Sequence, residues 1–136
     1  MPRFLLDTNA CIQIIKGRTP SLQARLANRQ RSDIAICATV WSELLVGPHL
    51  SKRGYAVVRA EIDRFSYFTL IPFDRLEAEH HAEIRAYLQS RGQLIGERDM
   101  QIAACARAHG LIVVTHNTHE FSRVPGLNIE DWEIAA

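Results

Sequence analysis

The alternation of short apolar runs with longer amphipathic segments constrains the fold more than any other feature of this sequence. The run at 111–115, LIVVT, is apolar at successive positions, which is typical of a parallel strand that is covered on both faces. Similar short runs occur at 3–7, 33–38 and 68–73, and a shorter candidate edge strand lies at 128–129. Strands that alternate with helices build parallel sheets through βαβ units, so we predict an α/β fold.

The segments between these strands carry signals for helices. The predicted helices span 8–17, 19–31, 39–47, 51–67, 74–92 and 97–109. Thr39 is expected to cap the helix at 39–47, and the pair Gly47 and Pro48 is expected to end it, because proline seldom continues a helix. Three apolar residues of the helix at 74–92 are expected to face the core: Leu76, Ile84 and Leu88.

Length and composition limit the class of protein. The 136 residues suffice for one domain with its own core, so we expect a single domain over 1–136. The sequence has neither a long apolar run nor the features of a signal peptide, which predicts a cytoplasmic protein without a membrane contact. The 3 cysteines form no CxxC pair and are expected to be small buried residues. A net charge of +1 neither suggests nor excludes a nucleic-acid substrate, which would need a local basic patch.

Three acidic residues stand where apolar residues are expected. Asp7 ends the first strand, Glu43 lies on the apolar face of the helix at 39–47, and Asp99 heads the apolar face of the helix at 97–109. An ordinary role is open to each of them, either as a partner of a helix dipole or as a rim residue that reaches water. The carboxyl ends of parallel strands meet at one edge of a sheet, so we expect the three acids to lie near one another there.

Carboxylates that gather at one edge need a compensating charge. Two of them about 4 Å apart repel by roughly 4 kcal/mol at an effective dielectric constant near 20, so a proton or a cation must relieve the repulsion. Oxygen ligands of this kind suit Mg²⁺ or Mn²⁺, which can activate water and stabilise a phosphoryl transition state. The hypothesis that follows is metal-dependent hydrolysis of phosphodiesters.

The segment THNTHEF at 115–121 supplies further candidates for this site. Asn117 offers a neutral ligand, or a hydrogen bond to an acid or to a metal-bound water, and Glu120 offers a possible fourth carboxylate. His116 and His119 could form a zinc pair, but the sequence presents no obvious third nitrogen or sulfur ligand. We therefore expect both histidines to be loop residues that can contact phosphate.

Three blocks of the sequence resemble the signature blocks of PIN-domain ribonucleases, and most closely those of VapC-type toxins from bacterial toxin–antitoxin pairs. These blocks are LLDTNACIQIIKG, ATVWSELLVG and IGERDMQIAACARAHGLIVVTHNTHEFSRVPGLNIEDW. The resemblance extends from Phe4 to Trp132 with the blocks in the family's order. It implies a three-layer αβα sandwich with a mostly parallel central sheet and an endoribonuclease that depends on Mg²⁺ or Mn²⁺.

The resemblance also assigns roles to individual residues. The family's three acids, which hold the metal and carry catalysis, fall on Asp7, Glu43 and Asp99. Many members have a fourth acid where this chain has Asn117, which weakens the case for a second tightly held metal, and Glu120 could take over part of that role. Three further residues match the polar positions that usually surround the acids: Thr8, Asn9 and Thr115.

The implied partners are a structured RNA, such as tRNA or rRNA, a second copy of the chain, and a VapB-type antitoxin. The antitoxin is expected to lay an apolar helix into a groove, for which the candidates, each equally explained by core packing, are Ile12, Ile15, Trp41, Leu45, Tyr55 and Val58. The candidate RNA contacts are Lys16, Arg18, Arg25, Arg29, Arg31, Arg91 and Arg98.

Two other classes of protein fit the sequence less well. A phosphatase of the haloacid-dehalogenase type also begins with an acid after the first strand, but it needs a second aspartate where this chain has Asn9. A catalytically weak PIN-like module that only binds RNA or a partner would have lost an acid. Asp7, Glu43 and Asp99 are all present, so the enzyme is preferred and Asn117 keeps the binding module open. The RNA, the cut site and the number of metal ions cannot be read from the sequence.

Overall fold

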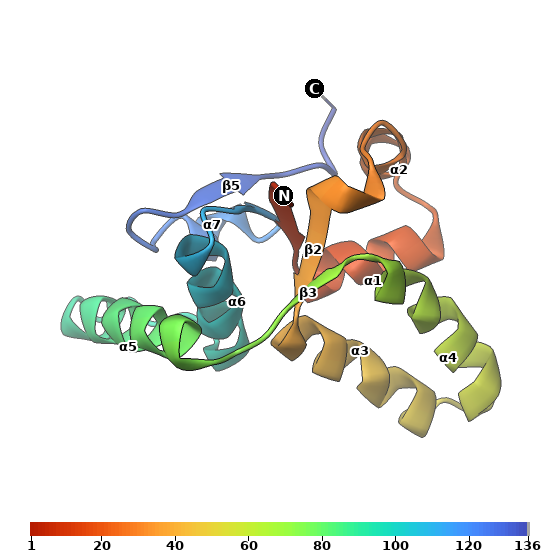
Figure 1. The fold of residues 1–136 in the computed structure, drawn as a ribbon, viewed down its shortest axis with the longest axis horizontal. Helices are drawn as coiled ribbons and strands as arrows, with labels where there is room; N and C mark the ends of the chain where they lie inside the picture. The colour runs from red at the N-terminus through yellow and green to blue at the C-terminus, as the bar shows by residue number, and fades with distance from the viewer. Residues whose placement is uncertain (136) are drawn as a thin grey trace.

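A parallel sheet lies at the centre of the computed structural model, which describes residues 1–135 (Figure 1). Within these residues its strands are β1 (Phe4–Leu6), β2 (Ile34–Cys37), β3 (Thr69–Ile71), β4 (Ile112–Val114) and β5 (Asn128–Glu130). They lie in the order β3-β2-β1-β4-β5, and each neighbouring pair is parallel. The prediction of an α/β fold with a parallel sheet is therefore confirmed, including the edge strand near 128–129.

Helices lie on both sides of the sheet. They are α1 (Thr8–Lys16), α2 (Pro20–Ala27), α3 (Ala38–Leu50), α4 (Tyr55–Asp63), α5 (Arg75–Ser90), α6 (Glu97–Ala108) and the short α7 (Thr118–Phe121). Figure 1 shows α5 and α6 together on one side of the central strands, with α1, α3 and α4 on the other. Two 3₁₀ turns, Arg31–Asp33 and Arg64–Tyr67, lead into β2 and towards β3. This layering is the sandwich that the family resemblance implies.

The predicted end of the helix at 39–47 is wrong. α3 begins after Cys37 and continues through Gly47 and Pro48 to Leu50. A proline removes one backbone hydrogen bond from a helix, but Pro48 is buried, so its packing offsets that loss. Thr39 does not cap the helix, because it lies inside it and Cys37 occupies the N-cap position; its hydroxyl donates to Gln101 Oε1 at 2.8 Å and so joins α3 to α6. The helix predicted over 19–31 is also shorter, since α2 ends at Ala27.

The inward face of α5 differs from the prediction at its first turn. Ile84 and Leu88 are fully buried as expected, but Leu76 is 48% exposed and Glu77 is buried in its place. One Glu77 carboxylate oxygen accepts the backbone N–H of Asp74 at 2.9 Å, in a capping box at the helix start. The other lies 2.6 Å from His109 Nε2, so both oxygens are satisfied inside the protein.

Replacement of Glu77 by alanine is expected to lower the free energy of unfolding by about 1–3 kcal/mol, because it leaves a partly buried backbone donor and His109 without their partner. Urea denaturation of the purified chain measures this loss. The matched control is Glu79→Ala, an exposed position on the same helix, for which a change within about 0.5 kcal/mol is expected. Equal effects of the two substitutions would contradict the structural role of Glu77.

Residues near the two ends of the chain pack against one another in the core, beside the first strand. Trp132 is completely buried and packs edge-on against Phe4, with 5.0 Å between the ring centroids.

Cys11, Cys37 and Cys105 are buried free thiols, as predicted. Within residues 1–135, no helix combines the length and the apolar character that crossing a membrane requires.

Candidate functional site

Asp7 lies at the carboxyl end of β1 and caps α1. Its carboxylate accepts the backbone N–H of Ala10 at 2.8 Å, so the capping role that the sequence left open is real. The side chain is nevertheless almost completely buried. Burial raises the pKa of Asp7 to about 6, against the hydrogen bonds from Thr115 and Ala10 and with the help of the charges on Asp99 and Glu133. An acid in this state is costly to ionise without a nearby cation.

Glu43 reaches the same region from the second turn of α3. Its Oε1 accepts the Thr8 hydroxyl at 2.6 Å, and its Oε2 lies 3.5 Å from Arg98 Nη1. The Glu43 side chain keeps 22% of its surface exposed, so it contacts water as well as these partners. Thr8 and Arg98 come from α1 and α6, which means that three helices meet at this carboxylate.

Asp99 lies in the first turn of α6 and is half-buried. Burial is the main reason why the pKa of Asp99 is raised, and the negative charges of Glu120 and Glu43 raise it further. A hydrogen bond with the Asn117 side chain opposes this and lowers the pKa. Asp7 and Asp99 also repel one another, since the charge of Asp99 contributes to the raised pKa of Asp7. The acids are therefore close enough to interact electrostatically.

Residues in the loop after β4 form hydrogen bonds with the acids. The Thr115 hydroxyl bonds to Asp7 and also accepts the backbone N–H of Asn117 at 2.9 Å. The Asn117 amide donates to Glu120 Oε2 at 2.7 Å and contacts Asp99. Asn117 thus connects Glu120 with Asp99, at the position where the family resemblance suggested a fourth acid.

The acids open into one cleft of about 1200 Å³. Five of the eight predicted site residues line it, namely Asp7, Thr8, Asn9, Glu43 and Asp99. Thr115, Asn117 and Glu120 do not line it, and they act through their contacts with the acids. Residues that the sequence did not single out also contribute to the wall, among them Ser42, Glu97 and Gln101. The structure brings the three acids together, and their roles in catalysis remain predictions.

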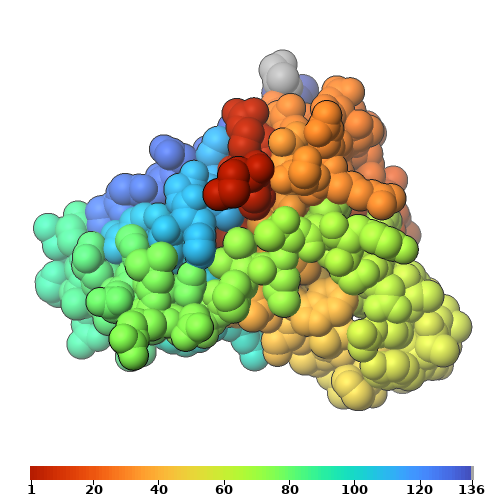
Figure 2. Space-filling model, viewed as in Figure 1, coloured from red at the N-terminus to blue at the C-terminus, as the bar shows by residue number. Residues whose placement is uncertain are grey.

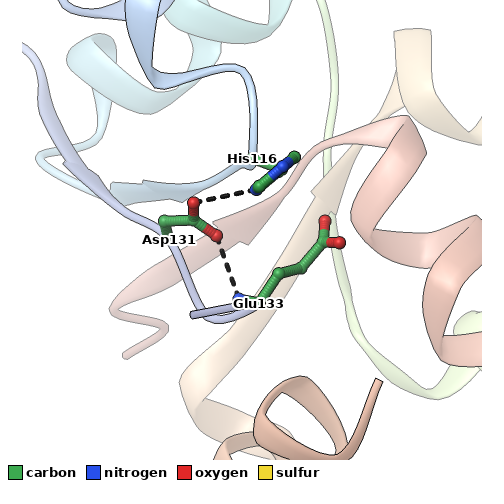
Figure 3. A group of neighbouring side chains, drawn as sticks. All are labelled: His116, Asp131 and Glu133. Carbon is green, nitrogen blue, oxygen red and sulfur yellow. Dashed lines mark hydrogen bonds and ion pairs between the residues drawn. The ribbon is translucent and has the colours of Figure 1, made fainter. Parts of the chain in front are cut away.

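A second polar cluster was missed from the sequence. His116 does not pair with His119; its Nδ1 lies 2.9 Å from Asp131 Oδ2, and Glu133 lies beside them (Figure 3). One nitrogen or oxygen atom from each of these three residues lies within 4.8 Å of the other two. The hydrogen bond with Asp131 raises the pKa of His116, and the negative charges of Asp131 and Glu133 add to this effect. The missed signal is the stretch EDWE at 130–133, because a buried Trp132 directs its two neighbours towards the opposite side.

Comparison with known sequences finds ribonucleases among the relatives of this chain. The sequence model of the PIN domain matches residues 4–127. The tRNA(fMet)-specific endonuclease VapC of Shigella flexneri is 38% identical over 135 residues, which cover 97% of this chain and 99% of the relative. Ribonuclease VapC2 of Rickettsia felis is 33% identical over 132 residues, which cover 96% of this chain and 98% of the relative.

Comparison with solved structures agrees. The crystal structure of DNA-bound VapBC from Salmonella typhimurium contains a similar chain, with 36% identity and a TM-score of 0.90 over 97% of this chain and 99% of that one. VapBC2 from Rickettsia felis, bound to a DNA fragment from its promoter, matches with 32% identity and a TM-score of 0.84 over 95% of this chain and 98% of that one.

Proposed function

Because the chain belongs to the VapC family of PIN-domain ribonucleases, we propose that its acid-lined cleft hydrolyses structured RNA with the help of Mg²⁺ or Mn²⁺. The observation that carries this proposal is the meeting of Asp7, Glu43 and Asp99, from three separate elements, at one cleft. Three carboxylates in partial burial repel one another, and a hard cation removes that repulsion.

The state of the acids supports a cation rather than a purely structural role. Among residues 1–135, neither Asp7 nor Asp99 forms an ion pair with a basic side chain. Both have raised pKa values, chiefly because of burial. Carboxylate oxygens are the ligands that Mg²⁺ and Mn²⁺ prefer, so Asp7 and Asp99 would hold the ion, with Glu43 contacting it directly or through water.

The side chains of the cleft have different roles in the proposed reaction. A divalent cation, when bound, supplies charge neutralisation and activation of water. Thr8 and Arg98 orient the Glu43 carboxylate, which then accepts the proton of the attacking water. The water adds to phosphorus in line with the bond to the 3′-oxygen, that bond breaks, and the released 3′-oxygen takes a proton from solvent. The products carry a 5′-phosphate and a 3′-hydroxyl. The RNA 2′-hydroxyl is then not the nucleophile.

RNA that enters an acidic cleft needs cations at its margin. Arg98 lies on the wall of the cleft, and 72% of its side-chain surface is exposed. It can therefore contact a phosphate while its Nη1 stays 3.5 Å from Glu43 Oε2. Lys16 and Arg18 line a neighbouring groove at the end of α1. These three are the predicted RNA contacts that line either of the two cavities.

Cleavage of purified tRNA and rRNA by the isolated chain tests the proposal. We expect cleavage in Mg²⁺ or Mn²⁺, loss of cleavage in EDTA, and new ends that carry 5′-phosphate and are therefore substrates for a 5′-phosphate-dependent ligase. Cleavage in EDTA with 2′,3′-cyclic phosphate ends would overturn the metal-dependent mechanism. Binding of RNA without cleavage under all of these conditions would favour the alternative, a PIN-like binding module.

The antitoxin partner is proposed from a second groove and from the VapBC complexes that resemble this chain. The groove has a volume of about 630 Å³ and lies between α1, α3 and α4, next to the acid-lined cleft. Of the six predicted residues, Ile12, Ile15 and Val58 line it, whereas Trp41, Leu45 and Tyr55 do not. Ile12 and Glu43 line both cavities, so a helix in the groove could send a basic side chain to the acids.

The substitution Ile15→Glu is expected to weaken binding of a VapB-type antitoxin at least about tenfold, because it replaces one of the apolar contacts of the groove by a charge, while RNA cleavage by the free toxin is retained. Titration of the purified toxin variant with the antitoxin encoded beside it measures the affinity. Leu94→Glu, at an exposed residue outside the groove, serves as the control and should bind like the unmodified chain. Equal affinity of all three proteins would argue against this groove.

Pairing of two chains remains a prediction. Exposed apolar side chains on β3 and its flanks are candidates for that contact: Tyr67, Leu70, Phe73 and Leu76. Figure 2 shows the segment from α4 to α5 as a continuous band across the surface of the molecule, with β3 at the open edge of the sheet. We further propose that the enzyme acts in the cytoplasm, where tRNA and rRNA are found.

A further inference from the structure

The cluster of His116, Asp131 and Glu133 combines one nitrogen donor with two carboxylates. His116 follows β4, whereas Asp131 and Glu133 follow β5, so two neighbouring strands deliver the three side chains to one place (Figure 3). Their candidate ligand atoms all lie within 4.8 Å of one another. Two ligands of one zinc ion lie about 3.4 Å apart in tetrahedral geometry, so small side-chain rotations would bring all three into coordination.

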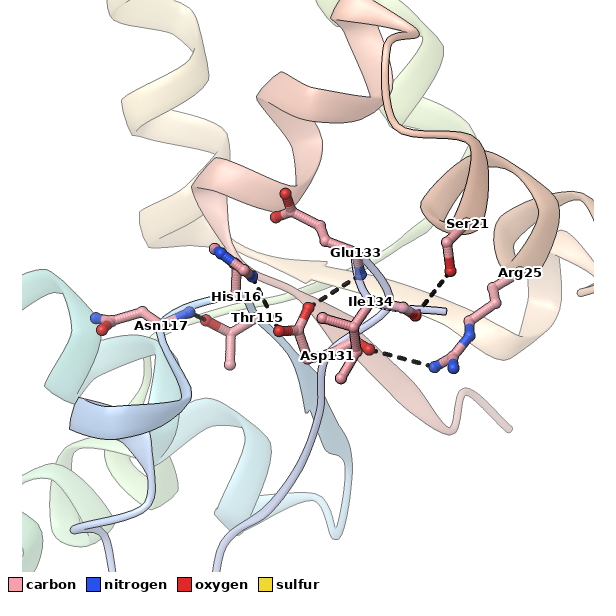
Figure 4. Close-up of polar contacts among 8 residues, drawn as sticks. All are labelled: Ser21, Arg25, Thr115, His116, Asn117, Asp131, Glu133 and Ile134. Atoms are coloured by element: carbon pink, nitrogen blue, oxygen red, sulfur yellow. Dashed lines mark hydrogen bonds and ion pairs between the residues drawn. The ribbon is translucent and has the colours of Figure 1, made fainter. Parts of the chain in front are cut away.

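The backbone that carries the cluster is held in place on several sides. Trp132 lies between the two acids in sequence and is completely buried against Phe4. The Asp131 carbonyl accepts a hydrogen bond from Arg25 at 3.3 Å, and the Ile134 carbonyl accepts one from Ser21 at 2.8 Å, so both anchor the segment to α2 (Figure 4). Fixed backbone positions reduce the entropy that is lost when side chains become ligands.

The orientation of the Asp131 side chain is also fixed. Its Oδ1 accepts the backbone N–H of Glu133 at 2.9 Å, while its Oδ2 faces His116 Nδ1. The Asp131 side chain is only 11% exposed. Hydrogen bonds that hold one carboxylate oxygen and leave the other directed at the site are typical of the outer shell of metal ligands.

No cation from the described part of the chain neutralises the Glu133 carboxylate. Among residues 1–135 it takes part in no ion pair, and Arg25, the nearby basic residue, bonds to a backbone carbonyl instead. With neutral imidazole the three side chains carry a charge of about −2 and offer mixed nitrogen and oxygen ligands. That set suits a divalent transition metal such as Zn²⁺ better than Mg²⁺, which prefers oxygen alone.

We propose that His116, Asp131 and Glu133 bind a divalent transition-metal ion, with Zn²⁺ as the best match, at a site separate from the acid-lined cleft. None of the three residues lines that cleft, and none of the cleft acids belongs to the cluster. The site therefore stands whether or not the cleft cleaves RNA. The remaining coordination positions are open to water, as in zinc sites that have three protein ligands.

Isothermal titration of the metal-free full-length chain with ZnCl₂ tests this site, and Co²⁺ as a spectroscopic probe reports the ligand set through its visible absorption bands. We expect one Zn²⁺ bound through the cluster per chain. His116→Gln and Asp131→Asn should each lower the affinity by at least about tenfold and weaken the Co²⁺ bands. His119→Gln, in the adjacent helix α7 with its imidazole next to Arg123, should bind like the unmodified chain.

A fourth variant separates this proposal from the proposed function. Asp99→Asn alters an acid of the cleft and should keep the Zn²⁺ affinity, whereas its RNA cleavage should fall. Unchanged Zn²⁺ affinity in both His116→Gln and Asp131→Asn would overturn the metal site and leave the ribonuclease proposal intact. Loss of Zn²⁺ binding in Asp99→Asn but not in His116→Gln would place the ion in the cleft and equally overturn the proposal. Far-UV circular dichroism verifies that each variant is folded.

Discussion

Replacement of Asp7 by asparagine is expected to lower the rate of RNA cleavage at least about a thousandfold while the protein stays folded. The substitution removes the charge that would hold the catalytic cation at almost constant volume. Asparagine caps a helix about as well as aspartate, so the hydrogen bond from Ala10 can be kept. Initial rates on a purified RNA substrate in Mg²⁺, measured at equal protein concentrations, give the ratio.

Glu97→Gln is the matched control for this experiment. Glu97 also lines the cleft, but its carboxylate lies 2.7 Å from His81 and 3.3 Å from Arg85, which are both on α5. Its loss changes the charge of the cleft by the same amount and should leave the cleavage rate within a few-fold. Full activity of the Asp7→Asn protein, or equal losses in the two variants, would show that Asp7 has no special role.

The same acid is expected to make the stability of the metal-free protein depend on pH. Burial raises the pKa of Asp7 from 3.8 to about 6, so the folded state binds this proton more tightly than the unfolded state does. The stabilisation from protonated Asp7 is therefore fully present below about pH 4 and is lost as the pH rises through 6. The difference corresponds to about 3 kcal/mol at pH 7.

Comparison of unfolding free energies isolates this contribution from other titrating groups. In EDTA, Asp7→Asn should be more stable than the unmodified chain by up to about 3 kcal/mol at pH 7, and the two should converge near pH 4. Mg²⁺ should stabilise the unmodified chain and have a much smaller effect on the variant. A constant difference between the two proteins from pH 4 to 7 would contradict the buried, destabilised state of Asp7.

Much of the architecture could be read from the sequence because burial on two faces leaves an unbroken apolar run. The strand at 111–115 and the parallel arrangement followed from that pattern, and the weak run at 128–129 proved to be β5. The limits of helices were less predictable where tertiary packing decides them. Pro48 is tolerated inside α3 because it is buried. Glu77 is buried instead of Leu76 because its carboxylate is hydrogen-bonded to the Asp74 backbone and to His109.

Part of the candidate site could also be predicted from the sequence, and part of it could not. Asp7, Glu43 and Asp99 were identified because each interrupts an apolar pattern, and they meet at one cleft. The bond between His116 and Asp131 joins residues that are 15 positions apart through the pairing of β4 and β5. Local periodicity carries no information about such a contact, which depends on the turn between the two strands.

The order of the strands has a consequence for the protein while it is being made. β1, which delivers Asp7, lies between β2 and β4, and its partner Ile112 comes more than one hundred residues after Phe4. A nascent chain on the ribosome lacks β4 and the start of α6 until most of its length has been synthesised. Until then the first strand has only one neighbour and Asp7 has no Asp99 beside it, so the three acids of the cleft come together only late in synthesis.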